Sequence, residues 1–599
     1  MIRFWLEKTW VQNTVLTALA LCMVYYWGFV FEFGYHFDWS VLYTENPTYK
    51  VNLGFELLKG LRLTVIISVV SSVAAVLLGT LFGLGRLSRF KPMRWISTAY
   101  VELMRNTPLL VQLFFWYFAF PRALPDNLRQ FVFDLHFLGV VNFEFLSATL
   151  GLSIYSGAFV AEVVRAGLQS IPKGLLEAAY SSGLSYVQVL TRIILPLAFR
   201  TIIPPLGSEL LSNMKNSSLA IVVGVPELCW SSQQIESLTF KGFEATTAAT
   251  ALYLVVSLSI SAVMNAVNRR LKVESMARRA SRLPGPLSRL WNAAVREKMF
   301  RPMRQGRSPG RELSLTYSRT QALLHTALRY LGKGLVLLGK AGFVAFLALI
   351  AYKTTLGLLG FNWQVIFDNF RTLLIWRFPR GDAHELFFGL GGLSFSIIMA
   401  VIAITVSFFI GLAVGIGRTS KNRVLRLPSL AYIEIIRGTP LIMVIFWVYF
   451  FVPVLFNTFL DVFWSATLAL TLFTGAYLAE IVRAGIENVA PGQSEAAYST
   501  GLSTLQTMRK IILPQALKQM IPAIVGQFIA IFKDTSLAYV IGVLELTFVA
   551  QGLNNRLMVY PFEIYSTVAA LYFVCCYCLS ILATRLERRL TPERVSLTM

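Results

Sequence analysis

EAAYSSGLSYVQVLTRIILP runs from Glu177 to Pro196, and EAAYSTGLSTLQTMRKIILP runs from Glu495 to Pro514, 318 residues later. Thirteen of the twenty positions are identical in these two stretches, which we call the EAA segments. The chain of 599 residues is 56% hydrophobic and only 14% charged, far more apolar than an ordinary soluble protein. Because the EAA segments carry Glu, Ser and Gln residues that would be costly in lipid, we expect both to lie outside the membrane.

Each EAA segment is expected to form two short helices joined by a bend at a glycine. In the first copy the bend is at Gly183, and Pro196 is expected to end the second helix. Ala178 and Ala179 are strong helix formers with little bulk, which lets the backbone of another protein approach closely. Glu177 adds one charge that can fix the register of such a contact. This composition is typical of a docking surface.

Apolar runs of about 20 residues recur along the chain, each long enough to cross a hydrocarbon core of roughly 30 Å. We predict an all-α polytopic membrane protein with about twelve transmembrane helices, half of them in each half of the chain. The spans of the first half are expected near residues 11–33, 61–85, 105–120, 145–165, 202–226 and 247–267. Those of the second half are expected near residues 335–355, 392–416, 438–455, 463–483, 516–541 and 563–583.

The net charge of +23 comes from Lys and Arg residues that gather in alternate loops. These residues follow the second, sixth, eighth and twelfth predicted spans: Arg86, Arg89, Lys91, Arg94; Arg269, Arg270, Lys272; Arg418, Lys421, Arg423, Arg426; Arg585, Arg588 and Arg589. Since cytoplasmic loops carry an excess of basic residues, these loops, both termini and both EAA segments are expected on the cytoplasmic side. The charge therefore indicates topology in a lipid bilayer, and no nucleic-acid partner is expected.

The duplication extends well beyond the EAA segments. VELMRNTPLL at 101–110 matches IEIIRGTPLI at 433–442 with an offset of 332 residues. GAFVAEVVRAG at 157–167 matches GAYLAEIVRAG at 475–485 with an offset of 318, so the first copy carries a longer outward loop, around 121–146. Copies that run in the same direction are parallel repeats, and a substrate path is expected between them.

Three regions follow from this alignment. The first repeat is expected at 1–268 and the second at 331–599. Residues 269–330 between them are rich in Lys, Arg and Pro, which is typical of a solvated cytoplasmic linker.

The spacing within the EAA segments is Glu-Ala-Ala, three residues, Gly, nine residues and Ile-x-Leu-Pro. It resembles the signature of the membrane permease subunits of ATP-binding-cassette (ABC) importers. Both copies match at every anchor: Glu177, Ala178, Ala179, Gly183, Ile193, Leu195 and Pro196, then Glu495, Ala496, Ala497, Gly501, Ile511, Leu513 and Pro514. The resemblance implies the type I importer permease fold, with each EAA segment as a coupling helix in a groove of a separate cytoplasmic ABC ATPase. Two copies would serve an ATPase dimer.

Other segments resemble the polar amino acid permeases, in particular those for acidic or general amino acids. They are ELMRNTPLLVQLFFWYF from Glu102, IEIIRGTPLIMVIFWVYF from Ile433 and the two GAxxAExxRAG stretches. This resemblance implies that an extracytoplasmic binding protein delivers an amino acid, which then crosses a prokaryotic cytoplasmic membrane by alternating access. The chain departs from the family in two ways. Asn106 stands where Gly438 has the more usual Arg-Gly-Thr-Pro form, and two units that are commonly separate chains are fused.

Charged residues recur near the ends of the predicted spans. Four Glu and Arg pairs are spaced three residues apart, so that their side chains can pair on one face of a helix: Glu102 and Arg105, Glu162 and Arg165, Glu434 and Arg437, Glu480 and Arg483. Their position near the cytoplasmic ends of the spans suits interfacial ion pairs or a gate.

Lys215, Lys533 and Asp534 fall nearer the interior of the fifth span of each half, where an ionisable residue is a candidate for the substrate path. Alternatives are open for both lysines. Lys533 and Asp534 can neutralise each other, and Lys215 can form a structural pair with Glu209.

Nothing in the sequence predicts catalysis by this chain. The four histidines are scattered, and neither HExxH nor GxxxxGK[ST] occurs, so ATP would be hydrolysed by a partner and no cofactor or metal is expected to bind directly. A twelve-helix secondary transporter driven by an ion gradient is the alternative, but it would have no ATPase to dock on the EAA segments. A membrane-embedded hydrolase would need clustered His or Asp residues, or a Ser-Lys dyad, within the spans, and we find neither.

Overall fold

The computed structural model describes residues 9–26, 35–46, 50–136, 141–271, 315–375, 389–456 and 458–590. Within these ranges the regular structure is helical, apart from two isolated bridges that join Glu45 to Asn52 and Gly392 to Glu545. The prediction of an all-α membrane protein is therefore confirmed.

The chain forms two compact units. One consists of residues 1–89, 93–263 and 364–599 and contains most of both predicted repeats, and the other consists of residues 90–92 and 264–363. The second unit contains α15 (Leu315–Leu359), a single helix of 45 residues. This helix begins inside the region predicted as a linker, of which residues 272–314 lie outside the described residues.

The elements of the first half are α2 (Thr9–Tyr25), η2 (Trp39–Leu42), α3 (Leu53–Arg86), α4 (Lys91–Asn106), α5 (Leu109–Phe114), η3 (Phe115–Ala119), η4 (Phe120–Ala123), α6 (Asp126–Phe133), α7 (Phe143–Gln169), α8 (Lys173–Ser181), α9 (Tyr186–Val189), η5 (Leu190–Ile194), α10 (Leu195–Asn216), η6 (Ser217–Val223), α11 (Leu228–Thr239) and α12 (Gly242–Leu271). After α15, those of the second half are α16 (Gln364–Leu374), α17 (Gly392–Thr419), α18 (Arg423–Gly438), α19 (Leu441–Phe456), α20 (Val462–Glu487), α21 (Pro491–Ser499), α22 (Thr504–Thr507), η8 (Met508–Ile512), α23 (Leu513–Asp534), η9 (Thr535–Ile541), α24 (Leu546–Leu557) and α25 (Pro561–Leu590).

The described residues contain nine helices long and apolar enough to cross a membrane, or ten if α18 and α19 form one broken span. The predicted count of about twelve included runs near 11–33 and 105–120, which contain only the shorter helices α2 and α5. The axis bends by 114° between α18 and α19, at Thr439 and Pro440. Proline supplies no backbone N–H and disfavours a helical residue before it, so these apolar runs are interrupted rather than straight.

Both repeats use the same close helix contact. A Cβ atom added to Gly79 of α3 would lie 2.5 Å from the side chain of Val160 in α7, and one added to Gly411 of α17 would lie 2.5 Å from Leu478 in α20. Small residues let membrane helices approach until their backbones nearly touch. The two repeats therefore have equivalent central helix pairs.

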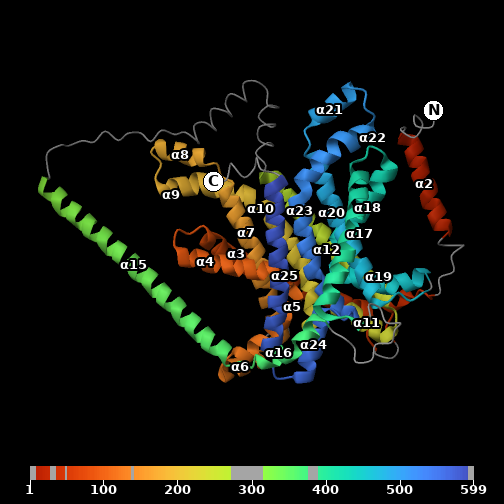
Figure 1. The fold of residues 1–599 in the computed structure, drawn as a ribbon, viewed down its shortest axis with the longest axis horizontal. Coiled ribbons are helices and arrows are strands. Elements are labelled where there is room, and N and C mark those ends of the chain that lie inside the picture. The colour runs from red at the N-terminus through yellow and green to blue at the C-terminus, as the bar shows by residue number, and fades with distance from the viewer. Residues whose placement is uncertain are drawn as a thin grey trace. The chain divides into compact units, whose positions relative to one another are not determined.

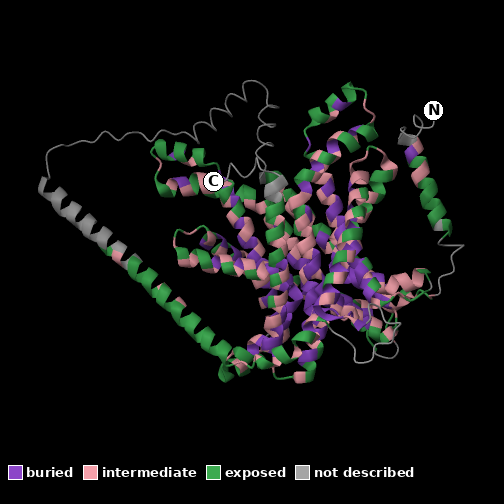
Figure 2. Ribbon diagram, viewed as in Figure 1, coloured by how far each residue is buried: buried purple, intermediate pink, exposed green. Residues whose placement is uncertain are grey.

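The core lies where the two repeats meet. Phe114 of α5 packs against Tyr565 of α25, with ring centroids 5.5 Å apart, and both side chains are fully buried. Figure 2 shows buried residues concentrated in the middle of this unit. In Figure 1 the short helices α8, α9, α21 and α22 lie at one end of the unit, and α11 and α24 lie towards the other.

Candidate functional site: two EAA segments and a cavity between the repeats

The bend in each EAA segment has the predicted form. Gly183 separates α8 from α9 with φ +79°, and Gly501 separates α21 from α22 with φ +81°. This left-handed conformation is unfavourable for residues that carry a Cβ. No heavy atom lies within 4 Å of a Cβ added at either position, so backbone conformation alone favours glycine there.

A capping box fixes the start of the second short helix in both copies. The Ser185 side chain accepts from the N–H of Gln188, whose side chain accepts from the N–H of Ser185, and Ser503 and Gln506 repeat the arrangement. The prediction that Pro196 ends this helix was wrong. The helix passes through the π-helical turn η5 into α10, and Pro196 lies in the first turn of α10, where a missing N–H costs little.

The outer surfaces of the EAA segments are unusually accessible. Glu177 and Ala178 are exposed while Ala179 is buried, and Glu495, Ala496 and Ala497 follow the same order. Large side chains beside them are also exposed: Tyr180 (47%), Tyr186 (66%), Val187 (64%), Tyr498 (47%) and Leu505 (72%). Each segment thus combines one carboxylate with apolar area, as protein interfaces do.

Glu162 is the centre of a charge cluster at the ends of α3, α4 and α7. Its carboxylate lies 2.6 Å from Arg86 and 3.9 Å from Arg105, and it also bonds Arg165. Glu102 lies 3.7 Å from Arg86. The expected pair of Glu162 with Arg165 is therefore formed. The expected pair of Glu102 with Arg105 is not among the ion pairs of the described residues, because each contacts a residue from another helix instead.

The second repeat has a smaller version of this cluster. Glu480 bonds Arg483 as expected and lies 3.8 Å from Arg437. Glu434 is exposed, and the described residues show no ion pair between it and Arg437. Both repeats thus use the carboxylate of their GAxxAExxRAG stretch to hold the arginine that ends the preceding bent helix.

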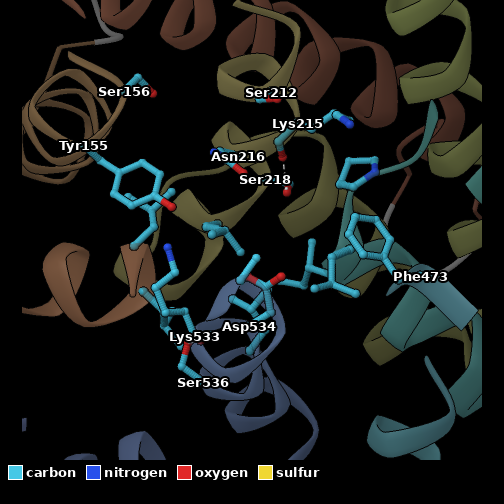
Figure 3. A pocket seen from close by; sticks show the side chains of 18 of the residues that line it. Tyr155, Ser156, Ser212, Lys215, Asn216, Ser218, Phe473, Lys533, Asp534 and Ser536 are labelled. Atoms are coloured by element: carbon cyan, nitrogen blue, oxygen red, sulfur yellow. Dashed lines mark hydrogen bonds between the residues drawn. The ribbon is translucent and has the colours of Figure 1, made fainter. Parts of the chain in front are cut away.

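A cavity of about 390 Å³ lies between the repeats. Its charged lining residues are Glu209, Lys215, Lys533 and Asp534. Figure 3 shows Lys215 and Asn216 on the opposite side of this space from Lys533 and Asp534. The structure therefore brings the three predicted path residues to one cavity, while the described residues give no ion pair between Lys215 and Glu209.

Each lysine of the cavity contacts the other repeat. Lys215 Nζ donates to the carbonyl oxygen of Arg437 at 2.9 Å and to the hydroxyl of Tyr477 at 3.1 Å. Lys533 Nζ donates to the carbonyl oxygen of Arg105 at 2.8 Å and lies 5.8 Å from the ring centroid of Phe159. A cation at the C-terminal end of a helix is favourable for the helix dipole.

The departure at Asn106 has a local explanation. The Asn106 side chain donates to the carbonyl oxygen of Glu102 at 2.7 Å and so closes the last turn of α4. At the equivalent position a Cβ added to Gly438 would lie 2.4 Å from the Leu254 side chain, and the Gly438 carbonyl accepts from Ser257. The two bent helices therefore have different neighbours at the same point.

Two buried carboxylates were missed by the sequence interpretation. Glu227 caps the N-terminus of α11, accepting from two backbone N–H groups and from the hydroxyls of Tyr253 and Thr64. Glu545 caps α24 in the same way, with Tyr572 and Ser396 as partners. GVPEL before α11 and GVLEL before α24, at the repeat offset of 318, were the available signal.

Comparisons with known proteins agree with two repeats. Residues 75–273 and 403–592 each match the family described as binding-protein-dependent transport system inner membrane component. The probable glutamine ABC transporter permease protein GlnM of Bacillus subtilis (strain 168) is 37% identical over 209 residues, which are 35% of this chain and 90% of GlnM. The glutamate/aspartate import permease protein GltJ of Escherichia coli (strain K12) is 31% identical over 236 residues, 39% of this chain and 95% of GltJ. A solved amino acid ABC transporter, described as crystallised with histidines, is 36% identical, covering 33% of this chain and 92% of that one with a TM-score of 0.31.

Proposed function

Since the chain belongs to the family of binding-protein-dependent transport system inner membrane components, we propose that it is the fused permease of an ABC importer for polar amino acids, with acidic or general L-amino acids favoured. The chain supplies the membrane pathway, and a separate ATPase dimer on the cytoplasmic side supplies the energy. The two EAA segments are the single observation that carries this proposal, because an ATPase dimer needs two equivalent docking sites.

The shape of the EAA segments supports docking. Each is a compact pair of helices with a glycine bend, a capping box, one exposed carboxylate and exposed apolar side chains. Glu177, Ala178, Ala179, Gly183 and Pro196 form the first coupling site, and Glu495, Ala496, Ala497, Gly501 and Pro514 form the second. The positive-inside rule puts both of these sites, and both termini, in the cytoplasm of a prokaryotic cell.

An amino acid substrate is supported by the relatives and by the cavity. GlnM and GltJ are named for glutamine and for glutamate and aspartate. The cavity between the repeats offers two ammonium groups and two carboxyl groups, a lining that suits a ligand with both an amino and a carboxyl group. An extracytoplasmic binding protein delivers this substrate, and closure of the ATPase dimer reorients the repeats by alternating access.

Co-purification with the co-expressed ABC ATPase tests the proposal. We expect the wild-type chain to retain the ATPase and the variant with Glu177→Lys and Glu495→Lys to lose it while remaining folded in the membrane. A matched control reverses two exposed carboxylates elsewhere, Glu45→Lys and Asp134→Lys, with the same change in net charge and no expected loss.

Two other results would revise the proposal. Undiminished ATPase retention by the EAA variant would place the docking site elsewhere on the chain. A wild-type chain that retains no ATPase would favour the ion-coupled secondary transporter, which uptake across an imposed proton or sodium gradient would then test.

A further inference from the structure

Two large side chains occupy an unfavourable backbone conformation at equivalent points of the repeats. The non-glycine residues with positive φ in the described ranges are Lys50, Phe240 (φ 56°) and Met558 (φ 54°). Phe240 ends α11 and Met558 ends α24, and they are 318 residues apart, the offset of the surrounding repeats. Helices that end in this conformation usually have Gly or Asn there, because neither residue is strongly disfavoured.

Both side chains project from the protein. Phe240 is 82% exposed and Met558 is 72% exposed, although large apolar side chains are normally covered. Their backbones are held in place: the N–H of Phe240 donates to Glu236 and that of Met558 to Asn554, both at 2.7 Å. The carbonyl of Met558 also accepts from Arg122, in the longer loop of the first repeat, at 3.2 Å.

The helices that carry these residues lead directly to the cavity. α11 follows η6 and α24 follows η9, and both 3-10 segments line the cavity, through Ser218 and Leu219 in η6 and through Ser536 and Leu537 in η9. Glu227 and Glu545 fix the starts of α11 and α24 to neighbouring helices of their own repeats. Phe240 and Met558 therefore lie at the outer ends of two anchored helices.

Their surroundings favour water over lipid. α11 and α24 lie towards the end of the unit opposite the EAA segments (Figure 1). Exposed polar side chains precede both residues on the same helices: Gln234 and Ser237 on α11, Asn555 and Arg556 on α24. Such residues would be costly in hydrocarbon, whereas an apolar centre with a polar rim is the usual composition of a protein interface.

We propose that Phe240 and Met558 are paired contact points for the extracytoplasmic binding protein, an inference that rests on the proposed function. The family is defined by its dependence on such a protein, and the two contacts, one per repeat, require a soluble partner with two apolar hollows. Docking at these points reaches the cavity through α11 and α24.

Glycine substitution separates docking from folding. Phe240→Gly and Met558→Gly relieve the unfavourable conformation, so the thermal stability of the double variant should be equal to or above that of the wild type. Its affinity for the binding protein, in lipid nanodiscs with the ATPase bound, should fall at least tenfold. Lys50→Gly is the matched control, since Lys50 has φ 51° but a polar side chain, and its affinity should stay at the wild-type value.

The outcomes are distinguishable. A double variant that binds the amino acid-loaded binding protein as tightly as the wild type overturns the paired contact while leaving the importer intact. A wild-type complex whose affinity for every co-expressed binding protein is undetectable overturns the proposed function, and the contact with it.

Discussion

Lys215 Nζ in the first repeat donates a hydrogen bond to the carbonyl oxygen of Arg437 in the second, at 2.9 Å. Lys533 and Arg105 form the reciprocal bond at 2.8 Å. The carbonyl groups in the last turn of a helix lack partners within that helix. The bent helix of each repeat is therefore completed by a lysine of the other repeat.

Removal of either lysine should weaken the contact between the repeats. Lys215→Met and Lys533→Met should each lower stability by about 1.5 to 3 kcal/mol, the usual range for a hydrogen bond to a charged group. Thermal unfolding in detergent measures the loss. Lys533→Met should be the more damaging change, because it leaves Asp534 without its neighbouring cation, whereas Lys215 is followed by Asn216. Adding Asp534→Asn should recover part of the loss, and a further loss would contradict this account.

The charge clusters should respond unequally to loss of their central carboxylate. Glu162 has three arginines within 4 Å and Glu480 has two. Glu162→Gln should therefore cost about 1 to 2 kcal/mol and Glu480→Gln about 1 kcal/mol or less, because both clusters are partly exposed to solvent. Melting temperatures at low and high salt should converge, since salt screens exposed charges. Equal losses at low salt would argue against Glu162 as the stronger centre.

The glycine bends allow a comparison within each EAA segment. Gly183→Ala and Gly501→Ala should cost about 1 to 2 kcal/mol each through the left-handed backbone alone. Gly174→Ala in α8 and Gly492→Ala in α21 are matched controls, because they also have open space around a Cβ but lie in right-handed helices. The controls should be neutral or stabilising in thermal unfolding. Equal effects at bend and control would show that the bend is not conformationally strict.

The buried carboxylates at the starts of α11 and α24 should be essential for folding. Glu227→Ala leaves two backbone N–H groups and two hydroxyls without their acceptor, and should cost about 2 to 4 kcal/mol. Tyr253→Phe removes only one donor and should cost about 1 kcal/mol. Glu545→Ala and Tyr572→Phe should repeat this order. Thermal unfolding of all four variants tests the ranking, and a tyrosine variant that loses more than its glutamate partner would reverse it.

Features set by local sequence could be predicted, and features set by tertiary contacts could not. The bends at Gly183 and Gly501 depend on residues a few positions away. The pairing of Arg86 with Glu162 joins helices 76 residues apart, so spacing along one helix suggested a pair of Glu102 with Arg105 instead. Hydropathy likewise counted the run near 105–120 as a span, because an average over residues does not register the bend at a Thr-Pro step.

The unbroken connection between α9 and α10 has a mechanical consequence. Tyr186–Val223 and Thr504–Ile541 are each one helical rod of 38 residues, roughly 50 Å long, from an EAA segment to the wall of the cavity. Pro204 and Pro522 interrupt the hydrogen bonding of the two rods at equivalent heights. Bending stiffness is lowest there, so we expect torque applied at one end to be delivered as a flexure at those two levels.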